Sequence, residues 1–441
     1  MLIQIAQFLL GLSLLIVIHE FGHFLPAKYF GIKVSKFYLF FDYKFSLIKK
    51  QIGETEWGIG WIPLGGYVKI EGMVDESMDT ENLSEEPEEW EFRAKPAWQR
   101  IIVLTGGVFM NFLTAYFIYV FLLMGYGKDY LPNDSLVNGI WTNEIGLEMG
   151  LENGDKILSI GDYTPESYSE TALEILLSQG EDLVVERDGR EVRIPIAVEF
   201  IEEMIKEKKF PGLIKPRMPY VVGSFAENSF GQALGLQVGD SIVGLNGQEM
   251  LFFDQYKSVL PDYAGEEVDL AYYRDGRADT LTFTLPESGR LDVYNTTAVF
   301  KYYEIKNKKY DFASALTGAG DEVAAKLDGY IRQFKLIFNP KTEAYKEVGG
   351  FLTILQQYEK AWDWRHFWEF TAFLSIMLGF LNILPIPALD GGHVVFTVIE
   401  MITGKKPSIK VLEIAQMIGF FLLLALLIFA NGNDVIRALF G

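Results

Sequence analysis

The chain has 441 residues, of which 49% are hydrophobic, and it carries a formal net charge of −20 at pH 7. This hydrophobic fraction is high for a soluble protein but low for a pure bundle of membrane helices, so membrane and aqueous parts should coexist. The negative charge argues against nucleic acid as a partner, because such binding relies on Lys and Arg to neutralise phosphates. The absence of cysteine excludes disulfides and Cys-type metal sites, and it leaves the redox compartment open.

Four apolar stretches are long enough to cross a bilayer as helices, and we expect spans at residues 1–30, 101–126, 366–389 and 411–431. The first could be a cleaved signal peptide. It lacks a positively charged N-terminal region, however, and its apolar stretch is longer than the apolar core of an ordinary signal peptide, so we expect it to be retained. Basic residues beside the spans place segments 31–100 and 390–410 in the cytoplasm. Both termini and residues 127–365 are then expected outside.

The first span contains the H-E-x-x-H motif His19-Glu20-Phe21-Gly22-His23. Positions four apart share a helix face, so His19 and His23 can present two imidazoles to one metal, with Glu20 close by as a proton acceptor. The alternative is a chance motif whose histidines merely reach the headgroups. Ionisable residues in spanning segments are usually functional, and the chain has only four histidines, so the motif favours a metal site.

Segment 31–100 is expected to hold a membrane-associated β-hairpin followed by an interfacial segment. Residues 56–70 combine β-forming residues with glycines and lie between the two spans that would build the site. They are compatible with an ordinary cytoplasmic hairpin and equally with a membrane-dipping hairpin whose edge accepts a substrate strand. The acidic residues of 75–91 then meet Trp90, Phe92 and Trp98, which indicates a solvated segment turning into an interfacial helix, or a flexible tether.

An internal repeat follows the second span. Gly150-Leu-Glu-Asn-Gly-Asp155 matches Gly235-Leu-Gln-Val-Gly-Asp240, and Arg187-Asp-Gly-Arg190 matches Arg274-Asp-Gly-Arg277. Each copy runs from a Gly-Asp turn through an apolar strand and a helical stretch to an Asp-Gly hairpin, which predicts two β-rich modules, at 127–205 and 211–290. Both resemble PDZ domains, which commonly capture an extended peptide; a steric filter above the membrane site is the alternative. Residues 291–365 are expected to form a linker with interfacial helices.

The third span ends in Asn382-Ile-Leu-Pro-Ile-Pro-Ala-Leu-Asp-Gly-Gly-His393. Its two prolines must break the helix, and non-helical backbone at membrane depth is tolerated only where protein or a cavity satisfies it. Asp390 follows on the side where His19 and His23 also lie. Two imidazoles and one carboxylate would provide the three protein ligands of a hydrolytic zinc site and leave a fourth position for water.

The other two histidines are interpreted as non-ligands. His393 lies just beyond the Asp390-Gly-Gly turn and is expected to be interfacial or to support Asp390. His366 lies among three tryptophans that predict an aromatic belt at the bilayer boundary, namely Trp362, Trp364 and Trp368.

Together, H-E-x-x-H in the first span, N-x-x-P-x-P-x-L-D-G in the third, the two PDZ-like copies and the four spans resemble the site-2 protease family, in particular its RseP-type members. The resemblance covers almost the full length and implies that His19, His23 and Asp390 bind Zn²⁺. It also implies that Glu20 is the catalytic acid and base, and that Asn382 contacts the substrate backbone or the developing oxyanion. It favours the membrane-dipping hairpin, with substrate-binding residues Gly58, Gly60, Trp61, Ile62, Pro385 and Pro387. One departure is Gly106-Gly107, where many family members have Gly-Pro.

The implied fold is a multi-pass α-helical membrane protein with two extracytoplasmic β-rich modules. The implied activity is cleavage of single-pass substrates such as anti-sigma factors after an upstream site-1 protease has trimmed them, with remnant signal peptides as a second class. The implied location is the cell inner membrane, with periplasmic modules and an active site near the cytoplasm. One alternative is a catalytically silent scaffold, which would not need Glu20. The other is a metal transporter, in which the spanning part usually repeats.

Overall fold

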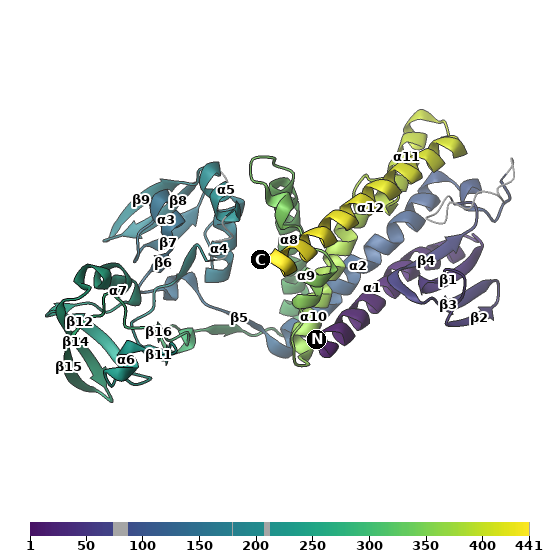
Figure 1. The fold of residues 1–441 in the computed structure, drawn as a ribbon. Helices are drawn as coiled ribbons and strands as arrows, with labels where there is room; N and C mark the ends of the chain where they lie inside the picture. The colour runs from purple at the N-terminus through teal and green to yellow at the C-terminus, as the bar shows by residue number, and fades with distance from the viewer. Residues whose placement is uncertain (74–86, 179, 207–211, 441) are drawn as a thin grey trace. The chain divides into compact units, whose positions relative to one another are not determined.

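The computed structural model describes residues 1–73, 87–178, 180–206 and 212–440, so most of the predicted acidic segment 75–91 lies outside the described residues. The chain forms two compact units (Figure 1). Unit 1 comprises Met1–Gly127, Lys309–Lys335 and Tyr345–Gly441, and unit 2 comprises Lys128–Lys308 and Leu336–Ala344. At the start and end of the long segment of unit 2, strand β5 (Lys128–Tyr130) pairs antiparallel with β17 (Lys306–Lys308).

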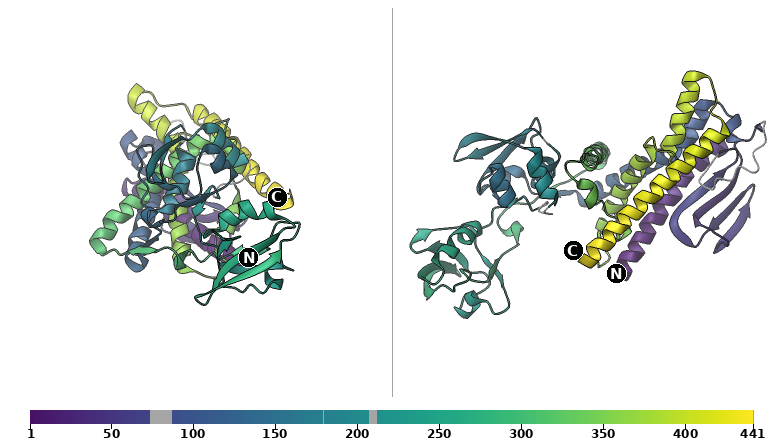
Figure 2. Two further views of the ribbon diagram at one scale, coloured as in Figure 1. Left: turned by 90° about the vertical axis from the view of Figure 1, so that its left-hand side faces the viewer. Right: turned by 45° about the horizontal axis from the view of Figure 1, so that its top comes forward.

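Unit 1 contains four helices long and apolar enough to cross a membrane, which confirms the predicted number of spans. They are α1 (Leu2–Tyr29), α2 (Ala97–Tyr126), α10 (Trp364–Ile383) and α12 (Ile409–Phe440). Figures 1 and 2 show both chain termini at the same end of this bundle, as an even number of crossings requires. Helix α2 is central, because it packs against α1 on one side and against α10 on another. Helices α8 (Phe312–Ile337) and α9 (Phe351–Gln356) lie within the predicted linker 291–365.

The third spanning helix ends earlier than predicted, at Ile383 instead of 389. Leu384 has extended backbone, as a residue before proline prefers, and the chain stays non-helical until Asp390. Helix α11 (Asp390–Thr403) begins there with an acidic residue in its first turn, where the helix dipole favours negative charge. Segment 390–410, expected as a loop, is therefore mostly helical.

A four-stranded sheet lies between α1 and α2 in the sequence and beside α1 in space (Figure 1). Its strands β1 (Val34–Phe41), β2 (Ile48–Ile52), β3 (Thr55–Ile59) and β4 (Ile62–Ile70) have the order β2-β3-β1-β4. The prediction that residues 56–70 form a hairpin is wrong, because β3 and β4 do not pair with each other. Strand β3 pairs parallel with one side of β1, and β4 pairs antiparallel with the other side of β1. The hairpin of this region is β2–β3.

The link between β3 and β4 explains this strand order. Gly60 and Trp61 carry the chain across the end of β1, where a Cβ on Gly60 would lie 2.2 Å from the Phe41 carbonyl oxygen. Only glycine allows so close a backbone approach. Among the described residues, β4 therefore has a strand partner on one side only.

Unit 2 contains two modules, each with its own hydrophobic core. The first module comprises β6 (Ile140–Thr142), α3 (Glu144–Met149), β7 (Lys156–Ile160), α4 (Tyr168–Leu177), β8 (Asp182–Arg187), β9 (Arg190–Pro195), α5 (Val198–Lys206) and β10 (Ile214–Pro216). The second comprises β11 (Val222–Phe225), α6 (Phe230–Ala233), β12 (Ser241–Leu245), β13 (Gln248–Glu249), α7 (Phe253–Val259), β14 (Glu267–Arg274), β15 (Arg277–Thr284) and β16 (Val293–Asn295).

The module borders differ from the predicted ones. Strand β10 pairs with β6, so residues 214–216 belong to the first module although they were assigned to the second. The core of the second module extends to Val293, because β16 returns to pair with β11. Pairing between strands distant in sequence, which no local pattern reveals, sets both borders.

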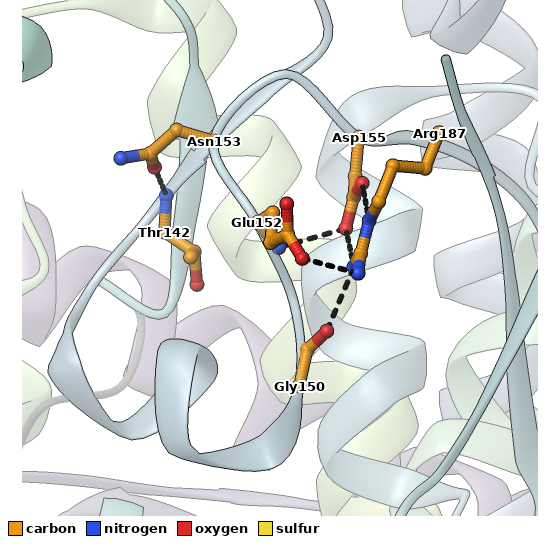
Figure 3. Close-up of polar contacts among 6 residues, drawn as sticks. All are labelled: Thr142, Gly150, Glu152, Asn153, Asp155 and Arg187. Carbon is orange, nitrogen blue, oxygen red and sulfur yellow. Dashed lines mark hydrogen bonds and ion pairs between the residues drawn. The ribbon is translucent and has the colours of Figure 1, made fainter.

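The two repeated motifs meet in space. Arg187 donates through Nε and Nη2 to the two Asp155 carboxylate oxygens, at 2.8 and 2.7 Å, and through Nη2 to the Gly150 carbonyl oxygen at 2.7 Å (Figure 3). Arg274 repeats these contacts on Asp240, at 2.8 and 2.6 Å, and on the Gly235 carbonyl oxygen at 2.8 Å. We call each set an arginine clamp. The clamp ties the Gly-Asp turn to the last hairpin, which gives the sequence repeat a structural role.

The substitution Asp240→Asn should weaken the second clamp. Burial disfavours the charge, yet hydrogen bonds from Arg274 and from the backbone hold the pKa of Asp240 below its usual value. Ionised Asp240 thus stabilises the fold above its unfolded pKa of about 3.9, and this contribution is lost as pH falls through the lower folded-state value. We expect the module to lose about 1–3 kcal/mol of unfolding free energy at pH 7, and part of its acid sensitivity.

Hydrogen exchange of the β14 amides in the full chain, followed against pH, measures both effects. Asp262→Asn is the control, because Asp262 is an exposed residue of the same module. Equal effects of the two substitutions would contradict a structural role for the clamp.

Candidate metal centre

Helices α1 and α2 touch backbone to backbone at three glycines. A Cβ on Gly22 would lie 2.3 Å from the Gly106 carbonyl oxygen, and one on Gly106 would lie 2.0 Å from the Gly22 carbonyl oxygen. Small residues permit such contacts between membrane helices. On the next residue, Gly107, a Cβ would lie 2.3 Å from His23 Nε2 and 2.7 Å from His19 Cε1. The Gly106-Gly107 pair therefore gives the two imidazoles the space that they occupy.

Three possible ligand atoms form a nearly equilateral triangle. His19 Nε2 and His23 Nε2 are 3.3 Å apart, and they lie 3.3 and 3.4 Å from Asp390 Oδ2. A tetrahedral zinc ion with ligand distances of about 2.0–2.1 Å would separate its ligand atoms by about 3.3–3.4 Å. Asp390 Oδ2 is buried and has no hydrogen-bond partner among the described residues, as expected of an atom that binds a cation. The residues present fit zinc.

Neighbours on α2 orient both imidazoles. His23 Nδ1 lies 2.8 Å from the Val103 carbonyl oxygen, so Nδ1–H donates there and Nε2 keeps its lone pair for a metal. His19 Nδ1 lies 3.0 Å from the Asn111 side-chain amide, whose Oδ1 has no partner among the described residues. With the amide turned by 180°, Asn111 Oδ1 accepts from His19 Nδ1–H, which satisfies both groups. Our sequence analysis assigned Asn111 no role, although an asparagine inside an apolar span was a usable signal.

A cavity of about 490 Å³ opens beside the triangle. His19, Glu20, His23, Asn382 and Asp390 line it, together with residues 66–70 of β4. The Glu20 carboxylate accepts a hydrogen bond from the backbone of Val68. Helix α1 and strand β4 therefore place a carboxylate, two imidazoles and a strand edge around one space.

The predicted substrate-binding residues lie in different places. Asn382 lines the cavity, and its Nδ2 lies 3.1 Å from His19 Nε2. The other six are absent from the described lining of the cavity, namely Gly58, Gly60, Trp61, Ile62, Pro385 and Pro387. Trp61 stacks on Phe45 and donates its Nε1–H to the Tyr43 carbonyl oxygen, 2.8 Å away. The far part of β4, residues 66–70, lines the cavity instead, and β1 separates this strand from β3.

A buried ion pair holds the helix that begins with Asp390. Arg100 Nη2 on α2 donates to Glu400 Oε1 on α11 at 2.5 Å, and the two side chains are only 9% and 11% exposed. Removing one partner of such a pair leaves an uncompensated buried charge, so the contact is costly to break. It fixes α11 against α2, the helix that also supports both histidines. The residues are 300 positions apart, and sequence reasoning missed them.

Comparison with known proteins agrees with this geometry. The model of peptidase family M50 matches residues 7–426. The chain is 28% identical to the regulator of sigma E protease of Haemophilus influenzae over 459 residues, which cover 98% of this chain and 99% of that protein. It is 27% identical to the regulator of sigma-E protease RseP of Escherichia coli over 454 residues, or 98% of each. A Rickettsia conorii protein, 27% identical over 443 residues and covering 98% of this chain and 99% of that protein, is named as a candidate zinc metalloprotease.

The substitution Gly107→Ala should disturb the two imidazoles without harming the helix. Alanine is the better helix former by about 1 kcal/mol, so any loss comes from the Cβ that meets His23 Nε2. We expect zinc affinity to fall at least about 10-fold, measured as zinc bound per chain across a series of chelator concentrations. Gly125→Ala on the same helix is the matched control, because its Cβ would meet nothing within 4 Å. Equal zinc binding by the two variants would show that this contact does not orient the ligands.

Proposed function

Because the chain belongs to peptidase family M50 and is a zinc metalloprotease, we propose that it cleaves peptide bonds within the membrane, with His19, His23 and Asp390 holding the zinc ion. The observation that carries the proposal is the triangle of ligand atoms beside Glu20 in an apolar helix bundle. A silent scaffold would have no need of this carboxylate, and a transporter would be expected to repeat its spanning part.

The roles of the side chains follow from their positions. When bound, zinc supplies Lewis-acid activation of water and of the peptide carbonyl. Glu20 takes the proton of the attacking water and returns it to the leaving amine. The Asn382 amide, beside His19, is placed to donate to the carbonyl oxygen of the substrate as negative charge develops there. Gly107 and Asn111 keep the imidazoles in place.

The substrate is proposed to bind in an extended form along β4. A transmembrane helix keeps its peptide groups in internal hydrogen bonds, so it must unwind before a carbonyl can be attacked. The outer edge of β4 has no strand partner among the described residues and lines the same cavity as Glu20. Strand addition there would replace the lost helical hydrogen bonds.

The substrate class is proposed from the relatives, two of which carry the name regulator of sigma-E protease. We infer single-pass proteins of the anti-sigma-factor type, trimmed first by a site-1 protease, with remnant signal peptides as a second class. Unit 2 is then periplasmic, and the catalytic end of the bundle faces the cytoplasm of a cell with an inner membrane. Its two modules are proposed to be PDZ-like and to bind a peptide or exclude bulky substrates.

The substitution Glu20→Gln should abolish proton transfer but leave the proposed ligands intact. We expect cleavage of a tagged single-pass substrate in reconstituted membranes to fall about 10²- to 10⁴-fold, while zinc content stays at one ion per chain. His23→Ala should instead lose zinc. Cleavage by Glu20→Gln at the normal rate would remove the proposed role of Glu20.

The substitution Val68→Pro tests the outer edge of β4, both as the donor to Glu20 and as the place of strand addition. It removes the backbone N–H that reaches Glu20 on the outer edge of β4, and edge strands tolerate proline where the N–H points away from the sheet. We expect kcat/KM to fall about 10-fold or more with zinc retained, whereas Val68→Ala, which keeps the N–H, should stay close to the unsubstituted protein. Equal activity of the two variants would mean that the β4 edge does not hold the substrate.

A further inference from the structure

Helix α12 carries one polar side chain that does not fit a lipid-facing helix. Most of its apolar residues are exposed on the bundle surface, including Met417 at 45% and Ile418 at 60%. Gln416 precedes them in the chain but is only 3% exposed. The helix therefore turns this amide inward, away from the surface that faces lipid.

The inward side of α12 meets the catalytic cavity. Gln416 lines this cavity together with Glu20, Asn382 and Asp390. At Gly419, three residues later and on the same helix face, a Cβ would lie 1.8 Å from the Pro387 carbonyl oxygen. The close contact at Gly419 anchors α12 to the break after the third span and fixes the direction of Gln416.

Among the described residues no hydrogen bond ties down the amide of Gln416, and its polar atoms are not among the fully buried ones without a partner, so the amide faces the open cavity. An amide on an otherwise lipid-facing helix is costly unless a polar partner meets it, and a leucine at this position would avoid that cost. Polar residues inside spanning helices usually serve a ligand or a pathway. The free amide therefore indicates a ligand that occupies the cavity.

We propose that Gln416 binds the peptide backbone of the substrate next to the scissile bond, an inference that rests on the proposed function. A glutamine amide offers both a donor and an acceptor, which match the N–H and C=O of an extended chain. Strand β4 would hold the substrate by its strand edge, and Gln416 would add a contact from α12. The same contact would couple substrate binding to the position of α12.

Kinetics in reconstituted membranes give the first test. Gln416→Leu should lower kcat/KM for a single-pass model substrate about 3- to 10-fold with zinc content unchanged, which corresponds to one lost neutral hydrogen bond. Met417→Leu is the matched control on the exposed face and should change nothing. Equal kinetics of Gln416→Leu and the unsubstituted protein would overturn the inference.

Cross-linking gives a readout that a purely structural role would not produce. The chain has no cysteine, so Gln416→Cys, Met417→Cys and Lys69→Cys can each be introduced singly into the full-length Glu20→Gln protein. The substrate carries one cysteine, moved stepwise through its transmembrane segment. We expect Gln416→Cys to form a disulfide with a few positions around the cleavage site, and Met417→Cys to form none.

The third variant separates two kinds of failure. Lys69 lies on β4 and lines the cavity, so Lys69→Cys reports whether substrate occupies the site at all. Cross-links from Lys69→Cys but not from Gln416→Cys would overturn the role of Gln416 alone. Cross-links from neither would overturn the proposed substrate site as well.

Discussion

The backbone contact between α1 and α2 is the constraint on which the rest of the catalytic unit depends. At Gly22 and Gly106 the two helices come closer than any side chain would allow. This proximity brings the Val103 carbonyl oxygen and Asn111 within hydrogen-bonding distance of the two imidazoles. A metal site needs its ligands oriented before the ion arrives, and here the neighbouring helix provides that orientation.

Helix α2 also carries the constraint to the third ligand. Arg100 lies two turns before Gly107 and pairs with Glu400 on α11, the helix that begins with Asp390. An ion pair buried this deeply contributes little net stability compared with apolar packing, but it penalises every arrangement that separates the partners. The same helix therefore positions all three atoms of the triangle, two through hydrogen bonds and one through a buried charge.

The cavity is built differently from the ligand set. Its walls come from a strand edge, a broken helix and α12, which are far apart in the sequence. Two of these walls present polar groups to the cavity, namely the β4 edge without a second strand partner among the described residues and the Gln416 amide, and such groups favour a polar ligand. A peptide in extended form supplies suitable partners, since its own backbone groups are exposed once its helix has unwound. The chemistry of the walls thus complements a transmembrane substrate in its unwound state.

Hydropathy and residue spacing by themselves determined four spanning helices, the two repeated modules and the residues of the H-E-x-x-H and L-D-G motifs, because these signals are local in the chain. Sequence alone could not order the strands around β1, since the order depends on a glycine crossover and on pairing between distant segments. For the same reason the predicted residues on β3, in the β3–β4 link and at the start of β4 are absent from the cavity lining, while residues 66–70 of β4 and Gln416 line it. Only the tertiary structure decided which polar groups face one another. The contact of α1 with α2 and the Arg100–Glu400 pair join residues far apart in the chain, and no local sequence pattern predicts such contacts.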